Sequence, residues 1–145
     1  MTAHHDTARN KDIVGAFHRR LWAEADLSVI EEVIAEDAVT HWGDAESGTA
    51  AAIRADAERY FSAFTDVSTS VDGLIGEHDK VVLRWTTTGR HTGPYGKVPP
   101  TGRVVTMRGV DVYRLDGGRV VEAWSLWDGL AAYQQLGLVD PEVGP

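Results

Sequence analysis

Asp111 is the residue of this sequence best placed for chemistry, because it is a carboxylate within a run of apolar, strand-forming residues. It belongs to the segment GVDVY at residues 109–113. Side chains on a strand alternate between faces, so Asp111 is predicted to share its side with Met107, Gly109 and Tyr113. Burial raises the pKa of a carboxyl group, since the charged form loses its water. We therefore predict that Asp111 exchanges protons near neutral pH, with Met107 and Tyr113 lining a pocket beside it. A purely structural acid is the alternative.

A histidine and a serine on two other predicted strands could assist this acid. His41 falls on a short strand at the expected mouth of the pocket, and an imidazole with a pKa of about 6.5 can give or take a proton. A surface position for His41 stays open. Ser125 points inward if its strand is regular, and we expect it to hydrogen-bond to substrate or to Asp111. No Ser-His-acid arrangement is evident, so a nucleophilic serine is not predicted.

Three tryptophans could form an aromatic wall for a flat polycyclic ligand. They are Trp42, Trp85 and Trp127, each on a predicted strand of the pocket. Indole rings suit a flat apolar molecule, because they offer a large surface at little cost in flexibility. Each tryptophan taken alone could equally belong to the ordinary core.

Composition narrows the class of protein. The chain has 145 residues, which favours one domain with a sizeable core. It has 22 acidic and 14 basic residues and a net charge of −8, which disfavours nucleic-acid binding. No apolar run is long enough to span a membrane, and no signal peptide is seen. The absence of cysteine fits a reducing cytoplasm. We expect a cytoplasmic protein whose partner is a small neutral or apolar molecule.

The elements that would position these residues follow an α+β order, with helices first and a meander of antiparallel strands after them. Residues 1–10 are polar and predicted to be a disordered tail. Asp26 is predicted to cap the second helix, and Asp128 the last one. The predicted helices cover residues 12–23, 27–34 and 49–64, with a last one after Asp128, and the predicted strands cover residues 38–42, 67–77, 81–92, 103–115 and 119–127.

Both faces of this predicted sheet are apolar. One layer of helices covers only one face, so the other needs a second cover, most simply a twin subunit. We predict a homodimer through the sheet, with Trp124 in or near the interface. On the last two strands one side carries Val110, Val112, Val120, Trp124 and Leu126, and the other carries Met107, Tyr113, Val121, Ala123 and Trp127.

Several turn and rim motifs give the chain a resemblance to the SnoaL-like polyketide cyclase family. The resemblance is dense from about residue 81 to 138. It implies the cone of ketosteroid isomerase and nuclear transport factor, a curved antiparallel sheet wrapped with three N-terminal helices around an internal pocket, as a single domain over residues 11–140. The motifs are GRHTG at 89–93, VPPTG at 98–102, Tyr113-Arg114, DGGRV at 116–120, Trp124 with Asp128, and QLG at 135–137.

The resemblance also implies roles for particular residues. Cyclases of this family use an aspartate on the last strand, where this chain has Ser125, and place a histidine where it has Asp111. Ketosteroid isomerases carry an aspartate at the Asp111 position, and His18 falls near the position of their oxyanion tyrosine. Compared with those cyclases, the acid of this site is therefore predicted to lie one strand away, at Asp111 instead of at the position of Ser125. Limonene-type epoxide hydrolases need an arginine at the place of Gly109, which counts against their version of the site.

The sequence thus predicts a cofactor-free cyclase or isomerase of secondary, polyketide metabolism, of the kind found in antibiotic biosynthesis. Asp111, His41 and His18 are its predicted catalytic residues, acting by proton transfer on a polyketide-derived or cyclic carbonyl compound. No metal site is recognised. The alternatives are an epoxide-opening or hydroxylase-type relative and a small-molecule binding module without catalysis.

Overall fold

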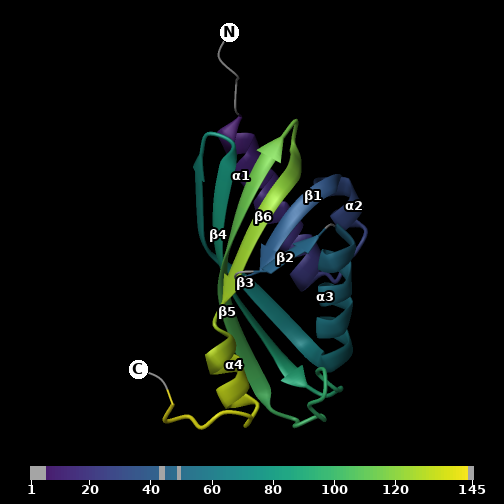
Figure 1. Ribbon diagram of the computed structural model, residues 1–145, viewed down its shortest axis with the longest axis vertical. Coiled ribbons are helices and arrows are strands. Elements are labelled where there is room, and N and C mark those ends of the chain that lie inside the picture. The colour runs from purple at the N-terminus through teal and green to yellow at the C-terminus, as the bar shows by residue number, and fades with distance from the viewer. Residues whose placement is uncertain (1–5, 43–44, 49, 144–145) are drawn as a thin grey trace.

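The computed structural model describes residues 6–42, 45–48 and 50–143, and it has the predicted α+β cone architecture. Within these residues a six-stranded sheet curves into a cup, with helices against its concave side (Figure 1). Hydrogen-bonded neighbours follow the order β2-β1-β6-β5-β4-β3. The strands are β1 Ile34–Trp42, β2 Ala45–Gly48, β3 Phe64–Glu77, β4 Lys80–His91, β5 Val104–Asp116 and β6 Arg119–Trp127.

The strands β3 to β6 form the antiparallel meander that the sequence predicts. The first part of the sheet differs from the prediction. β1 begins four residues before the predicted start at Ala38, and β2 was not predicted. β1 pairs in parallel with β6, so that Thr40 lies opposite Ala123. No turn joins these two strands, and sequence patterns near either strand therefore gave no sign of the pairing.

The helices lie where the sequence places them, with different ends. None of those in the described part of the chain is long and apolar enough to cross a membrane. The helices are α1 Thr7–His18, which runs on into a π-helical turn at Arg19–Ala23, α2 Val29–Val33, α3 Ala50–Ala63 and α4 Gly129–Gln135.

The start of α1 corrects the prediction of a tail over residues 1–10. The helix begins at Thr7 and not at Asp12, because the side chain of Asp6 caps it and accepts a hydrogen bond from the backbone N–H of Arg9 at 3.0 Å. The last four residues of the predicted tail are therefore helical. The prediction for residues 1–5 lies outside the described residues.

The start of α2 also differs from the prediction. Ser28, and not Asp26, stands at the N-cap, and the helix is shorter than predicted. Asp26 instead organises the turn before it: its carboxylate accepts the N–H of Ser28 at 3.2 Å and the guanidinium of Arg20 at 2.7 Å. This turn connects α2 to the end of the first helix.

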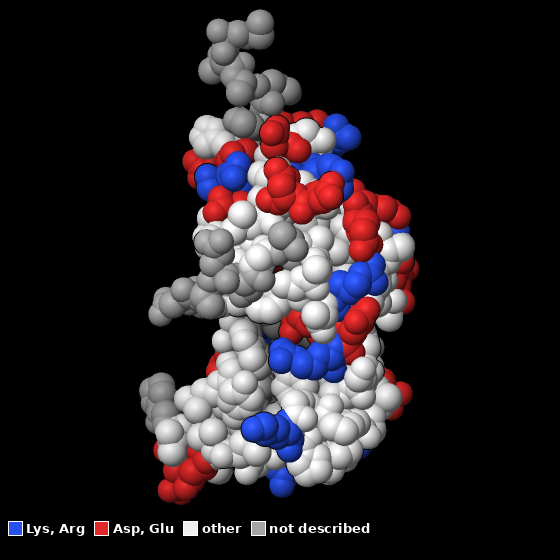
Figure 2. Space-filling model, turned by 45° about the vertical axis from the view of Figure 1, so that its right-hand side comes forward, with Lys and Arg blue, Asp and Glu red and all other residues white. Residues whose placement is uncertain are grey.

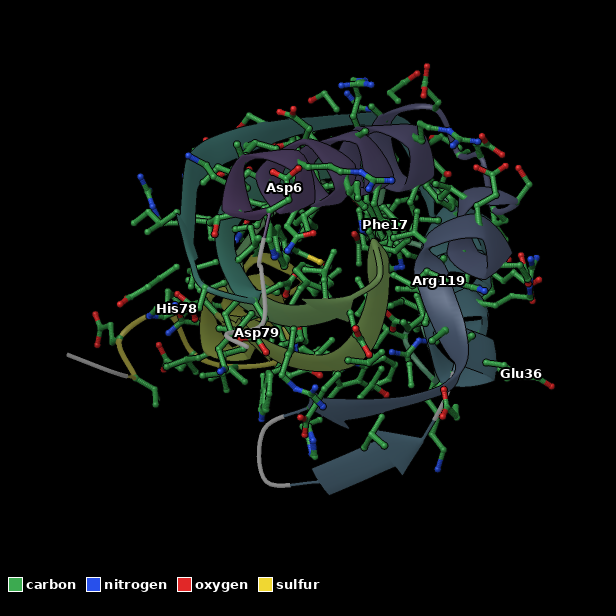
Figure 3. All side chains as sticks on the ribbon, turned by 90° about the horizontal axis from the view of Figure 1, so that it is seen from above. Asp6, Phe17, Glu36, His78, Asp79 and Arg119 are labelled. Carbon is green, nitrogen blue, oxygen red and sulfur yellow. The ribbon has the colours of Figure 1, made fainter. Side chains whose placement is uncertain are left out.

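Two hydrophobic cores enclose the middle of the cup. In the first core, Phe17 of α1 points inward (Figure 3). Its ring meets that of Tyr113 edge-on, with ring centres 6.1 Å apart. In the second core, Phe64 stacks on Tyr60, and both pack near Val105. The space between these cores is left for a cavity.

A bulge in β6 decides which side chains at the start of this strand face the concave side of the sheet. The register of β5 against β6 shifts after Arg114, so that Leu115 lies opposite Val120 and Val121 is the extra residue. Val120 is therefore buried on the inner side. This corrects its predicted place beside Trp124, which stays on the convex face of the sheet, here called the outer face.

A single glutamine completes the exposed edge of β5. β6 ends at Trp127, and beyond it Gln135 of α4 takes the place of a strand. Its side-chain oxygen accepts the N–H of Thr106 at 2.7 Å, and its amide nitrogen donates to the carbonyl of Thr106 at 2.8 Å. Asp128 caps α4 as predicted, accepting the N–H of Ala131 at 3.0 Å. The edge is thereby closed.

Replacing Gln135 with Ala is expected to lower the free energy of unfolding by about 1–3 kcal/mol, because it leaves two partly buried backbone groups of Thr106 without partners. Urea unfolding followed by circular dichroism measures the loss. Gln134→Ala is the matched control, since Gln134 bonds only exposed carbonyls of the C-terminal segment. Equal losses for the two variants would contradict the edge-closing role.

Candidate functional site

A cavity of about 380 Å³ lies between the sheet and α3. Figure 2 shows a recess at mid-height on the face that α3 shares, with basic and acidic side chains beside it. The inner residues of β4, β5 and β6 form one wall, and α1 and α3 form the other. Strand alternation turns Trp85 and Thr87 of β4 and Met107 and Asp111 of β5 to this wall, while the end of β6 contributes the consecutive residues Ser125, Leu126 and Trp127.

Asp111 reaches the cavity from β5 and is only 9% exposed. It lies opposite Ser125 in the sheet, and the Ser125 hydroxyl donates to its Oδ1 at 2.7 Å. The hydroxyl of Tyr113 donates to its other oxygen, Oδ2, at 3.2 Å. Tyr113 itself is behind the acid and not among the cavity-lining residues, which corrects its predicted place in the substrate pocket. Asp111 is thus held by two hydroxyl groups, one from the neighbouring strand β6 and one from its own strand.

Burial raises the pKa of Asp111 above its ordinary value of 3.8. Hydrogen bonding from Ser125, Trp85 and Tyr113 acts in the opposite direction, because these donors favour the carboxylate. The indole nitrogen of Trp85 is buried and has no hydrogen-bond partner at bonding distance among the described residues, so its N–H acts on Asp111 only as a nearby dipole. A carboxyl group whose pKa is raised above its ordinary value and that has nearby donors is suited to taking up and releasing a proton.

Gly109 makes room for the indole of Trp85. The two residues are paired across β4 and β5, and a Cβ at Gly109 would come within 2.4 Å of the Trp85 ring. Any side chain there would push the ring away from Asp111. The glycine is therefore needed for a close approach, not for a turn.

His18 lines the cavity from α1 and is 2% exposed. Its Nε2 lies 2.9 Å from the hydroxyl of Thr69, which lies 2.8 Å from the hydroxyl of Thr87. Burial lowers the pKa of His18 to about 4, although Asp72 acts against this, so the imidazole is neutral at pH 7. Its Nδ1 is buried without a partner among the described residues. A neutral imidazole can offer an N–H to a ligand oxygen.

The apolar walls include four residues that the sequence placed in the pocket: Trp42, Trp85, Trp127 and Met107. Trp127 is 39% exposed and so stands at the rim rather than in the interior. A flat apolar ligand would find indole rings on several sides of this cavity.

His41 is not part of the cavity, which corrects its predicted place at the pocket mouth. Since Trp42 faces inward, its neighbour His41 faces outward by alternation. There it stacks on Trp124 with ring centres 5.4 Å apart, and its Nε2 lies 2.9 Å from Glu122. Glu122 also accepts from Arg114 at 3.2 Å. The histidine belongs to a polar cluster on the outer face.

The sequence analysis did not identify the residues that α3 contributes. Asp56 lines the cavity together with Arg59 and Tyr60, which lie one helical turn after it, and Tyr95 joins them from the loop after β4. A signal was present, because Asp56 lies four residues before the buried Tyr60 and so interrupts the apolar stripe of the helix. In the described ranges no group of three or more histidine or acidic side chains is arranged to hold a metal ion.

Comparisons with known proteins agree on one family. The family model described as SnoaL-like polyketide cyclase matches residues 12–136. AclR from Streptomyces galilaeus, a candidate hydroxylase, is 30% identical with a TM-score of 0.86, covering 96% of this chain and 87% of its own. A candidate polyketide cyclase from Acidithiobacillus ferrooxidans is 30% identical with a TM-score of 0.78, covering 92% and 98%. IdmH from Streptomyces antibioticus, another candidate polyketide cyclase, is 28% identical with a TM-score of 0.75, covering 88% and 98%. No curated protein matches the chain.

Replacing Asp111 with Asn is expected to raise the free energy of unfolding at neutral pH. A folded-state pKa above 3.8 means that the wild-type protein loses stability as the pH rises from that value through the folded pKa, because the folded state must then hold a dehydrated charge. The gain in the Asn variant should therefore grow over this pH range and then level off. Urea unfolding of both proteins across pH measures it.

Asp72→Asn provides a control of opposite sign. Hydrogen bonds from Thr86 and Ser70 lower the pKa of Asp72, so its carboxylate stabilises the fold above its ordinary pKa and this variant should lose stability at neutral pH. A difference between Asp111→Asn and wild type that does not change with pH would contradict a raised pKa for Asp111.

Proposed function

The chain belongs to the SnoaL-like polyketide cyclase family, and on that premise we propose that it is a cofactor-free acid–base catalyst acting on a flat, apolar, polyketide-type carbonyl compound. The observation that carries this proposal is Asp111, a buried carboxyl group that faces a cavity lined with indole rings. Structural acids are seldom placed where they meet a ligand site and have a raised pKa. Asp111 is here the group that moves the proton.

The proposed reaction begins with the Asp111 carboxylate. It removes a proton from the carbon next to the substrate carbonyl, and the electron pair moves onto the carbonyl oxygen. The hydroxyl groups of Ser125 and Tyr113 donate hydrogen bonds that stabilise the buried carboxylate, so that it can act as a base. They stay beside the same two oxygens when the carboxyl group is protonated. The proton then returns to the substrate at another atom, as an isomerase or cyclase requires.

His18 supplies the donor for the oxygen that gains charge. The hydroxyl of Thr69 has two acceptors in reach, Nε2 of His18 at 2.9 Å and the carbonyl of Thr86 at 3.3 Å. When it donates to the nearer Nε2, with the hydroxyl of Thr87 donating to Thr69, the hydrogen of the imidazole is on Nδ1. That N–H has no protein partner among the described residues and is free to meet an enolate oxygen. Its neutral state at pH 7 avoids placing a full charge in the cavity.

An epoxide-opening or hydroxylase-type reaction is the second candidate. AclR, at 30% identity over nearly the whole chain, is itself a candidate hydroxylase, and an acid that donates a proton to an epoxide oxygen would suit the same cavity. A binding module without catalysis is the third. Conversion of an aryl epoxide to its diol would favour the second, and ligand binding without any turnover the third.

Asp111→Asn tests the proposal with β-tetralone, a flat ketone whose α-protons exchange with deuterated water. Wild type should accelerate this exchange, and the variant should lose roughly a hundred- to ten-thousand-fold of the acceleration, because Asn keeps the shape but cannot take a proton. Proton magnetic resonance follows the loss of the α-proton signal, and fluorescence quenching of the tryptophans checks that both proteins bind the ketone.

His41→Gln is the control, since it removes an ionisable side chain that lies outside the cavity. This variant should exchange at the wild-type rate. Exchange by Asp111→Asn at the wild-type rate would refute the assignment of the base.

We also propose that two copies of the chain pair through the outer face. Val110 is 37% exposed there, in the middle of the sheet, and Val112 and Trp124 lie opposite each other beside it. The helices cover only the concave side, so this apolar area is open in a single chain. A twofold contact would cover it with a copy of itself.

Val110→Glu should convert such a dimer into monomers, because it would place two charges in a dry contact. Light scattering coupled to size-exclusion chromatography gives the mass of both forms. Leu138→Glu is the matched control. Leu138 is also an exposed aliphatic residue, 53% exposed, but it follows α4 and lies outside the proposed contact. Wild type eluting as a monomer would contradict the dimer.

A further inference from the structure

α3 places an ionised carboxyl group at the mouth of the cavity. Asp56 lines the cavity, and its side chain is 36% exposed, so its charge keeps contact with water. Nη2 of Arg59, three residues further along the helix, donates to Oδ1 of Asp56 at 2.9 Å. Burial raises the pKa of Asp56 above its ordinary value, while the charge of Arg59 and its hydrogen bond act in the opposite direction. This ion pair, open to water on one side, holds Asp56 as a carboxylate.

Only one oxygen of the Asp56 carboxylate is used within the described part of the chain. Oδ1 accepts from Arg59, and Oδ2 accepts no hydrogen bond from the described residues. The guanidinium is itself held in place, because it lies 5.4 Å from the centre of the Tyr95 ring. Asp111 differs in this respect, since both of its oxygens accept hydrogen bonds from protein hydroxyl groups. Of these two cavity-lining acids, Asp56 is therefore the one with an acceptor to offer a ligand.

Two polar atoms deeper in the cavity have the opposite character. The hydroxyl of Tyr60 and Nδ1 of His18 belong to residues that line the cavity, and both atoms are buried without a partner among the described residues. The hydroxyl can donate a hydrogen bond, and Nδ1 carries a hydrogen in the tautomer proposed above. Acceptor oxygens of a ligand would satisfy both atoms. A ligand therefore meets donors in the interior and an acceptor at the mouth.

We infer that Asp56 selects and orients the substrate by accepting a hydrogen bond from a hydroxyl group on the outer edge of that substrate. The inference rests on the proposed function, since it takes this cavity as the substrate site. It adds the class of substrate: a hydroxylated aromatic ketone whose carbonyl lies inside and whose hydroxyl lies at the mouth. Such a site discriminates against an analogue that cannot donate, because Oδ2 of Asp56 then loses water without gaining a partner.

Two ketones that differ in a single donor test the inference. 6-Hydroxy-β-tetralone carries the hydroxyl, and 6-methoxy-β-tetralone keeps the oxygen but has no hydrogen to donate. The 7-substituted pair moves this oxygen by one ring position. Titration calorimetry gives the Kd of each ketone without turnover, and the hydroxyl preference is the Kd of the methoxy ketone divided by that of its hydroxy partner. At one ring position or both, this preference should be roughly tenfold larger for wild type than for Asp56→Leu, because leucine keeps the size of the side chain but accepts no hydrogen bond.

Glu58→Leu is the matched control for the loss of an acid from α3. The side chain of Glu58 is 59% exposed, lies 3.9 Å from Arg54 and is not among the cavity-lining residues. This variant should keep the wild-type preference. If wild type and Asp56→Leu have equal preferences at both ring positions, the inference is overturned. Wild type that binds neither hydroxylated ketone overturns it as well.

Kinetics separate an orienting role of Asp56 from a chemical one. The hydroxyl is bound equally before and during proton transfer, so Asp56→Leu should raise KM for α-proton exchange of the hydroxylated ketone about tenfold and keep kcat within about threefold. Exchange of β-tetralone, which has no hydroxyl, should also stay within about threefold of wild type. A loss in kcat of roughly a hundredfold or more would show that Asp56 takes part in proton transfer and would overturn the orienting role.

The inference and the proposed function can fail separately. If Asp111→Asn exchanges at the wild-type rate, the proposed base is wrong, and the hydroxyl preference measured by calorimetry still reports on Asp56. If Asp111→Asn loses exchange while Asp56→Leu keeps the wild-type preference, the proposed function stands and the role of Asp56 is overturned.

A crystal structure decides the question if Asp56→Leu does not fold. Wild type with the more tightly bound hydroxylated ketone should show the phenolic oxygen about 2.5–2.7 Å from Oδ2 of Asp56, the range for a hydroxyl group that donates to a carboxylate. A phenolic oxygen elsewhere in the cavity, or a ketone whose carbonyl faces the mouth, would overturn the inference.

Discussion

The structure depends on burying the carboxyl group of Asp111 away from water while still providing it with hydrogen-bond donors. Desolvation of Asp111 opposes its ionised form, and the donors Ser125, Tyr113 and Trp85 reduce this opposition without cancelling it. Each donor comes from a different place: the next strand, the same strand two residues on, and the strand on the other side. Strand pairing and alternation place all three on the same face of the sheet as the acid.

The rest of the chain maintains this balance. The core that contains Phe17 and Tyr113 packs on one side of the acid and the core that contains Phe64 and Met107 on the other, so little of Asp111 is exposed to water. Gly109 lets an indole lie against the strand that carries the acid. A neutral His18 adds a polar atom without adding a charge. The site is therefore polar at a few points inside an apolar container, which suits a flat substrate with few oxygens.

Strand periodicity accounts for what the sequence could reveal. It predicted the meander, the inward direction of Asp111 and Ser125, and the tryptophans of the cavity wall, because alternation is a local property of a chain. It failed where the answer depended on distant partners. His41 was assigned to the mouth on the strength of its strand alone, yet the inward place on that strand belongs to Trp42. Asp56 was missed although it shares the apolar side of its helix with Tyr60, because the pattern does not show that this part of the helix faces a cavity instead of the core.

The parallel pairing of β1 with β6 has a consequence for the order in which the sheet can form during synthesis. β1 is synthesised early but can pair with β6 only after that last strand has been synthesised, since Thr40 lies opposite Ala123. Until then one edge of the nascent sheet stays unpaired, and closing so long a stretch of chain is slow. The cup that shelters the acid can be completed only after β6 has been synthesised.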